Sequence, residues 1–184
     1  MGRMPHGSEI LRGYGLSETA AECVLQACAE AGGGPRRERT KYRILIAEDN
    51  RITQQIIEFA LDALDVELYF VYDGAQAVSM ASETDFDLMI MDMRMPLMTG
   101  LEALELIFAW YDADNRPRPR WIALTADITD QTRDHAERLG VTTFMRKPVD
   151  VLELQREVTT VRQNRKKPGG GRRGHFTNHP SGLV

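Results

Sequence analysis

The sequence predicts an α/β fold in which a doubly wound parallel sheet, (βα)5, has the strand order 2-1-3-4-5. Short apolar segments alternate with segments of helical periodicity between residues 41 and 165. The third apolar segment, Leu88 to Met91, contains no polar residue, which is typical of a strand that is buried on both faces of a parallel sheet. Parallel strands need right-handed crossovers, so we expect helices on both faces of the sheet.

Five short segments are predicted to be strands because they are rich in aliphatic and aromatic side chains and are bounded by turn residues. Asp73 and Gly74 supply the turn after the second segment. Pro96 and Gly100 follow the third segment and break it into a turning loop. The predicted strands are residues 43–47, 66–71, 88–91, 121–124 and 141–145.

Five helices are predicted between and after these strands. Apolar residues recur at helical spacing from Ile52 through Phe59 to Leu64, and the third helix presents Leu104 and Phe108 on one face. Gly140 is the residue at which the fourth helix is expected to end. The predicted helices are residues 52–64, 75–82, about 100–111, 127–139 and 149 to about 165.

The two ends of the chain differ from this unit. Residues 1–40 are predicted to be a flexible segment with a short helix at about 19–31, which is either the end of an upstream domain or a partner-binding element. Residues 166–184 are basic and rich in glycine, so we expect a disordered, solvated tail rather than a site for RNA or an acidic partner. The predicted domain is residues 41–165.

Composition narrows the class of protein. No apolar run approaches the roughly 18 residues of a membrane span, so we expect no membrane contact by this chain. Residues 41–161 hold 22 acidic and 12 basic side chains, a balance that makes nucleic-acid binding by the domain unlikely. Cys23 and Cys28 have neither a CxxC nor a zinc spacing, which favours reduced thiols in a cytoplasmic protein.

Polar residues follow four of the five predicted strands. Glu48 and Asp49 follow the first, Asp92 the third, Thr125 the fourth and Lys147 the fifth. In this strand order the first and third strands are neighbours at the switch point, where α/β sheets bind ligands. Three clustered carboxylates repel one another unless a cation is present, and Mg²⁺ suits such oxygen ligands. A metal, a lysine and a hydroxyl around one carboxylate indicate phosphoryl transfer to that carboxylate.

Each of these residues also has a purely structural interpretation. Glu48 and Asp49 would form an acidic first turn with Asn50 as the helix N-cap, and Asp92 would cap the loop that follows its strand. Lys147 would be a solvated charge. The functional interpretation is favoured because the residues occur together, each at the end of a different strand. The sequence contains no phosphate-binding glycine-rich loop, so a nucleotide is not expected to be the donor.

Four motifs carry a resemblance to a known family: Ile-Leu-Ile-Ala-Glu-Asp-Asn from Ile44, Met-Asp-Met-Arg-Met-Pro-Leu-Met-Thr-Gly from Met91, Leu-Thr-Ala from Leu124, and Phe-Met-Arg-Lys-Pro from Phe144. Over about residues 42–163 the sequence resembles the receiver domain of two-component response regulators, which has a flavodoxin-like fold. The Glu-Asp-Asn form is most similar to receivers of hybrid sensor histidine kinases.

The resemblance implies a role for each residue of the acidic group. Asp92 would accept a phosphoryl group from a phosphohistidine of a histidine kinase or a histidine phosphotransfer protein. Asp49, Asp92 and the backbone carbonyl of Arg94 would bind Mg²⁺, and Glu48 would act through a water molecule. The chain would then be a phosphorylatable signalling domain of a phosphorelay rather than an enzyme with turnover.

The resemblance also implies a switch. Lys147 would pair with the phosphoryl group, Thr125 would move to bond a phosphoryl oxygen, and the ring of Phe144 would follow it inward. The fourth helix, fifth strand and fifth helix would present the altered surface to a downstream partner. The added charge of about −1.5 to −2 is enough to bias a bistable loop.

Some features depart from the family pattern. The loop from residue 113 to residue 120 is longer and more basic, which should affect packing rather than chemistry. Asp127 is expected to cap the fourth helix rather than to slow hydrolysis of the acyl phosphate, and His135 is expected to be a surface residue. Two alternatives stay open: a docking module that is never phosphorylated, and a Mg²⁺-dependent phosphatase or phosphotransferase of related topology. The second would need a mobile acid at the position of Arg94.

Overall fold

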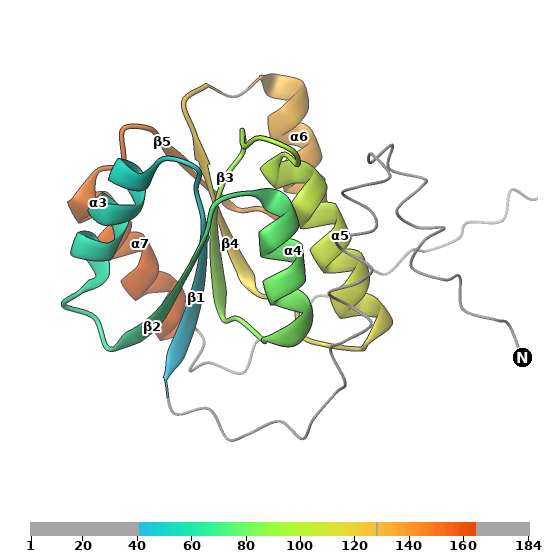
Figure 1. The fold of residues 1–184 in the computed structure, drawn as a ribbon, viewed down its shortest axis with the longest axis horizontal. Coiled ribbons are helices and arrows are strands. Elements are labelled where there is room, and N and C mark those ends of the chain that lie inside the picture. Colours follow the sequence, from blue (N-terminus) through green and yellow to red (C-terminus); the bar gives the residue numbers. More distant parts are fainter. Residues whose placement is uncertain (1–40, 128, 165–184) are drawn as a thin grey trace, which may run out of the picture.

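A computed structural model describes residues 41–127 and 129–164 and contains the predicted sheet. All strand pairs are parallel, and the order is β2-β1-β3-β4-β5 (Figure 1). The strands are β1 (Tyr42–Ala47), β2 (Val66–Val71), β3 (Leu88–Asp92), β4 (Arg120–Thr125) and β5 (Thr143–Arg146). The predicted fold class and strand order are confirmed.

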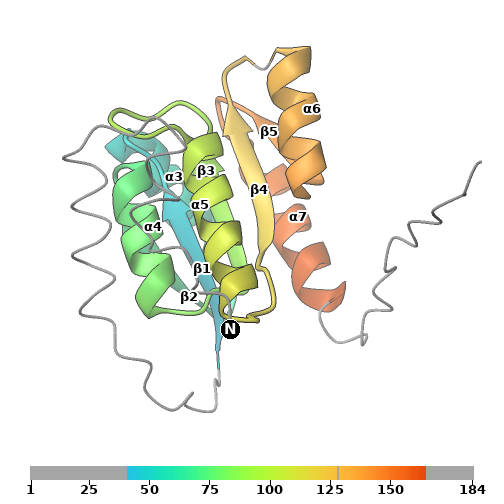
Figure 2. The same ribbon diagram turned by 90° about the vertical axis from the view of Figure 1, so that its right-hand side faces the viewer.

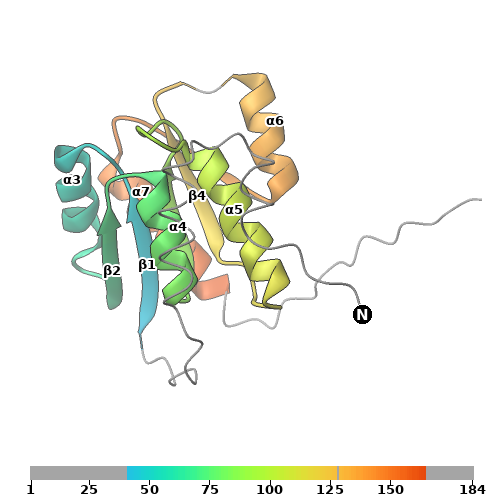
Figure 3. The same ribbon diagram turned by 45° about the vertical axis from the view of Figure 1, so that its right-hand side comes forward.

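Five helices connect or follow these strands. They are α3 (Arg51–Leu61), α4 (Gly74–Glu83), α5 (Gly100–Ala113), α6 (Asp130–Leu139) and α7 (Val151–Asn164). Helices α3 and α7 lie on one side of the sheet, and α4, α5 and α6 lie on the other, as the views in Figures 1, 2 and 3 show together. The sheet is therefore covered on both faces, as parallel strands require.

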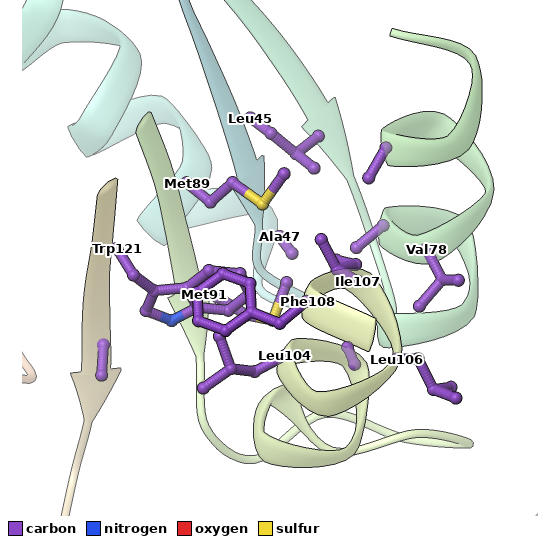
Figure 4. Close-up of a cluster of buried hydrophobic side chains, with 14 of the residues drawn as sticks. Leu45, Ala47, Val78, Met89, Met91, Leu104, Leu106, Ile107, Phe108 and Trp121 are labelled. Atoms are coloured by element: carbon purple, nitrogen blue, oxygen red, sulfur yellow. The ribbon is translucent and has the colours of Figure 1, made fainter. Parts of the chain in front are cut away.

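Two apolar clusters fill the space between the sheet and its helices. On the side of α4 and α5, Met89, Met91 and Trp121 of the strands pack with Leu104 and Phe108 (Figure 4). On the side of α3 and α7, the cluster is mostly aliphatic. Its buried members include Ile44, Ile46, Ile57, Ile90, Ile122, Leu124, Leu154 and Val158. Side chains of a strand alternate between the two faces of the sheet. Successive apolar residues of β1, β3 and β4 therefore belong alternately to one cluster and to the other.

The buried face of α3 differs from the spacing that predicted this helix. Ile52 and Phe59 have 67% and 75% of their surface exposed, whereas Gln54, Ile57 and Leu61 are buried. The apolar spacing from Ile52 to Leu64 correctly predicted a helix, but Ile52 and Phe59 do not lie on its core side, and the helix ends at Leu61, before Leu64. A glutamine occupies the core side instead, at a position that periodicity assigns to an apolar residue.

The beginning of α6 corrects two predictions. The helix begins at Asp130, and Thr129 is its N-cap, because the Thr129 hydroxyl accepts from the Thr132 amide at 3.3 Å. Asp127 is therefore not the cap. Its backbone oxygen accepts a hydrogen bond of 2.7 Å from the Thr125 hydroxyl. A threonine closer to the helix supplies the capping oxygen that the prediction assigned to the carboxylate.

The end of α6 shortens β5. Gly140 adopts a left-handed conformation (φ 105°), and the Val141 amide donates back to the oxygen of Ala136 at 3.0 Å. This is the hydrogen bond of a glycine-ended helix, so Val141 belongs to the helix-ending turn. The strand begins two residues later than predicted, at Thr143.

The basic loop between α5 and β4 packs against the domain through two arginines. Arg116 forms an ion pair of 2.6 Å with Asp85, and its guanidinium lies 3.9 Å from the centre of the Tyr111 ring. Arg118 lies over the ring of Phe108 at 4.5 Å. The loop precedes β4 and therefore lies at the amino end of the sheet, opposite the carboxyl ends that carry the acidic residues.

The predictions for residues 1–40 and 166–184 lie outside the described residues, and the predicted domain limits stay predictions. None of the described helices has the length and apolar character that are needed to cross a membrane.

Candidate functional site

The acidic turn after β1 has one buried and one exposed carboxylate. Glu48 is completely buried, and its Oε1 accepts the Asn50 amide at 3.1 Å. Asn50 in turn caps α3, since its side chain accepts the amides of Ile52 and Thr53. Asp49 is exposed, and within the described part of the chain no hydrogen bond or ion pair holds its carboxylate. The turn thus has the structural role that an N-cap predicts and also presents a free carboxylate.

Asp92 is the last residue of β3 and is 5% exposed. Its Oδ1 accepts the Arg94 amide at 2.9 Å, which orients the carboxylate within its own loop. Gly100, at the start of α5, lies tightly against this strand end: a Cβ added there would come within 2.3 Å of the Asp92 backbone oxygen. The glycine is therefore required by close packing against the residue that carries the carboxylate.

Lys147 joins the two buried carboxylates. Its Nζ donates to Asp92 Oδ2 at 2.6 Å and lies 2.6 Å from Glu48 Oε2. The contact with Glu48 is an ion pair without hydrogen-bond geometry, so among the described residues Oε2 has no hydrogen-bond partner. The Lys147 amide donates to the Thr125 oxygen at 2.8 Å, which fixes the residue beside the end of β4. The ends of β1, β3, β4 and β5 thus meet at Lys147.

The charges of this group perturb one another. Burial raises the pKa of Glu48 above its ordinary value of 4.5, and the contact with Lys147 offsets this only in part. Burial lowers the pKa of Lys147, but the hydrogen bond to Asp92 and the ion pair with Glu48 outweigh this effect, so the pKa lies above 10.5. Lys147 therefore remains protonated at neutral pH, while the fold disfavours the ionised form of Glu48.

Three carboxylates of the site fit a divalent cation. Oxygen atoms of Glu48, Asp49 and Asp92 lie within 4.8 Å of one another. All three are hard oxygen ligands, and the exposed Asp49 leaves one side open to water, an arrangement that suits Mg²⁺. Among the described residues, Glu48 Oε2 accepts no hydrogen bond, so it retains the capacity to bond a water molecule of the metal.

Thr125 and Phe144 lie beside this group on β4 and β5. Thr125 is buried, and its hydroxyl donates to the Asp127 backbone oxygen rather than to Asp92. Phe144 is partly buried against the cluster under α5, and the Arg133 guanidinium lies 4.6 Å from the centre of its ring. Arg133 belongs to α6, so a cation–π contact joins this helix to β5.

Two residues of this region were not found by sequence reasoning. Gln54 is buried on α3, and the signal was a polar residue at a core position of a helical pattern. Arg133 gave no signal, because a surface arginine on a polar helix is ordinary. His135 is partly exposed, in agreement with its predicted surface position, and its Nε2 contacts Glu105 Oε1 of α5 at 2.7 Å.

The fold and the site define a doubly wound α/β domain with an acidic pocket and a lysine at its switch point. The model of the response regulator receiver domain family matches residues 44–159, and the chain belongs to this family. It is therefore a receiver domain of two-component signalling, a phosphorylatable signalling domain. Mg²⁺ binding at an acidic pocket is a general property of the family.

Curated relatives include sensor proteins, hybrid signal transduction histidine kinases and a response regulator receiver protein. The sensor protein GacS of Pseudomonas syringae is 27% identical over 143 residues, which cover 78% of this chain and 16% of GacS. The sensory/regulatory protein RpfC of Xanthomonas campestris is 28% identical over 61% of this chain and 15% of RpfC. The receiver protein Anae109_2439 of Anaeromyxobacter is 34% identical over 61% of this chain and 45% of its own. The chain thus spans less than half of each of these relatives.

Solved structures show the same fold. The receiver domain of Ssk1 from Saccharomyces cerevisiae, crystallised with the histidine phosphotransfer protein Ypd1, is 25% identical, with a TM-score of 0.60 over 67% of this chain and 90% of that one. The chemotaxis protein CheY4 of Vibrio cholerae is 23% identical and has a TM-score of 0.58. The match covers 66% of this chain and 99% of the CheY4 chain.

Proposed function

We propose that Asp92 is the phosphoacceptor of a phosphorelay and takes its phosphoryl group from a phosphohistidine. The observation that carries this proposal is the convergence on Asp92 of one ammonium group and two further carboxylates from two other loops. An aspartate that only capped its loop would need no contact outside that loop. Asp92 also contacts Lys147, which is 55 residues away in the sequence. The donor is a histidine kinase or a histidine phosphotransfer protein.

The proposed reaction moves one phosphoryl group. An Asp92 carboxylate oxygen attacks phosphorus, the bond between phosphorus and the imidazole nitrogen breaks, and the imidazole leaves with a proton. Asp49, Asp92 and the Arg94 carbonyl would hold Mg²⁺, and Glu48 would act through a water molecule. The bound metal would neutralise charge on the phosphoryl oxygens. Lys147 stays positive at neutral pH and supplies the second positive charge, in agreement with its raised pKa.

The proposed switch begins at Thr125. In the structure its hydroxyl donates a hydrogen bond to the Asp127 backbone oxygen. To donate to a phosphoryl oxygen instead, Thr125 must break this bond, which frees the loop before α6. The ring of Phe144 follows, and the contact with Arg133 transmits the change to α6. The readout surface for a downstream partner is the face of α6, β5 and α7. The receiver domain comprises residues 41–165 and acts in the cytoplasm.

Phosphorylation by a small donor tests this proposal. The full chain, incubated with phosphoramidate and Mg²⁺, should gain the mass of one phosphoryl group. Asp92→Asn should gain none, and the exposed Asp62→Asn, a matched control, should behave as the parent. Thr125→Val should take up the group but lose the accompanying amide shifts of α6 in NMR spectra. No mass gain in the parent, or a gain that survives Asp92→Asn, would favour a module that acts by docking alone.

A further inference from the structure

We infer that Gln54 is a positioning residue that holds the acidic turn in the geometry that binds Mg²⁺. This inference rests on the proposed function and adds a residue to it. Gln54 is the fourth residue of α3 and is 7% exposed. Its Nε2 donates to two backbone oxygens, that of Glu48 at 2.7 Å and that of Val71 at 3.3 Å.

These two oxygens mark the point at which β1 and β2 separate. Ala47 and Val71 are the last paired residues of the two strands, and the Glu48 amide makes one further bond to the Val71 oxygen at 3.1 Å. Beyond this point the sheet no longer fixes the backbone of the acidic turn. The side-chain amide of Gln54 extends this hydrogen bonding by one residue, because it donates both to the Val71 oxygen at the end of β2 and to the Glu48 oxygen.

The carbonyl of Glu48 belongs to the peptide group that leads into Asp49. The carboxylate of Asp49 has no partner among the described residues, so the backbone on either side of it, rather than a contact of its own, places it. Glu48 itself is held by Lys147 and by the Asn50 amide. The Gln54 bond therefore holds the peptide on the amino side of Asp49, and the Glu48 side chain holds the peptide on its carboxyl side through the Asn50 amide.

The chemical type of the residue fits this role better than it fits the core. Packing alone would favour an apolar side chain at this position, which lies beside Ile57 and Leu61 on the buried face of α3. An apolar residue would leave the buried Glu48 oxygen without its donor, which is unfavourable for a buried polar group. Outer residues that orient metal ligands typically change metal affinity by about 10- to 100-fold when they are replaced.

The test compares Gln54→Met with Gln55→Met. Both substitutions remove an amide from the same helix, but Gln55 is exposed. We expect Gln54→Met to weaken Mg²⁺ binding by about 10-fold or more, measured by calorimetry at a temperature where the variant is folded, and Gln55→Met to leave it unchanged. In the metal-free protein, hydrogen exchange at the amides of residues 48–50 should accelerate in Gln54→Met and not elsewhere in the sheet.

The outcomes separate this inference from the proposed function. If the parent binds no Mg²⁺ and takes up no phosphoryl group, the proposed function fails. If the parent does both and Gln54→Met retains the parental Mg²⁺ affinity, the positioning role alone is refuted. A purely structural role would predict faster exchange throughout the sheet and an unchanged affinity in the folded variant, and that result also refutes it.

Discussion

Replacing Lys147 by methionine should lower the free energy of unfolding of the metal-free domain at neutral pH. The substitution keeps most of the side-chain volume but removes the ammonium between Glu48 and Asp92, whose side chains are 0% and 7% exposed. Lys147 itself is 19% exposed, so solvent screens these contacts little. Removing one partner of a buried ion pair costs about 3–5 kcal/mol, and we expect a loss of about 3 kcal/mol because water reaches the pocket beside Asp49.

The difference between parent and variant should depend on pH in a defined way. The folded-state pKa of Lys147 is raised, so its contribution to stability is present below 10.5 and is lost as the pH rises through the folded pKa, above that value. The folded-state pKa of Glu48 is also raised, so below it this carboxyl is neutral and no longer needs a cation. The difference in free energy of unfolding between parent and Lys147→Met should therefore be largest between the folded-state pKa values of Glu48 and Lys147. It should become smaller at lower and at higher pH.

Urea denaturation followed by circular dichroism measures this difference at each pH. Lys41→Met is the matched control, because Lys41 contacts Asp65 at 3.7 Å with both side chains more than half exposed. Such a surface pair contributes only about 0–1 kcal/mol. If Lys147→Met loses no more stability than Lys41→Met at pH 7, or if its loss is the same at every pH, the electrostatic account of the site is wrong.

Two further substitutions test other parts of the domain. Gly100→Ala would place a Cβ 2.3 Å from the Asp92 oxygen, so we expect a loss of about 3 kcal/mol in urea denaturation together with slower phosphoryl uptake; parental values for both would contradict the close packing. Arg116→Met removes the buried ion pair with Asp85 at the opposite end of the sheet. We expect a loss of about 3–5 kcal/mol but, at a temperature where the variant is folded, parental phosphoryl uptake. Slower uptake would show that this loop acts on the site.

The sequence was most informative where one local rule dominates. The uninterrupted apolar run from Leu88 to Met91 predicted a doubly buried strand, and the strand lies in the middle of the sheet. Predictions failed where several local rules compete. At the start of α6, Asp127 and Thr129 can both cap a helix, and only the path of the loop decides between them. At the end of α6, Val141 has a high strand propensity but completes a helix-ending turn.

The tertiary structure also decided which face of α3 is buried. Ile52 and Phe59 are exposed, while Gln54 is buried, because the ends of β1 and β2 leave backbone oxygens that need a donor. Similarly, the position of Phe144 beside Arg133 depends on the packing of a polar helix against β5. Neither arrangement is encoded by the spacing of residues along the chain.

By itself, the sequence determined the (βα)5 order and the residues at the strand ends, because alternating apolar periods and polar residues after strands are local properties. The carboxyl ends of parallel strands share one edge, so these residues were bound to lie near one another. Only the tertiary structure decided how they share charge. It buried Glu48, left Asp49 in solvent and placed Lys147 within 2.6 Å of Glu48 and Asp92, because burial and distance depend on contacts between loops that lie far apart in the chain.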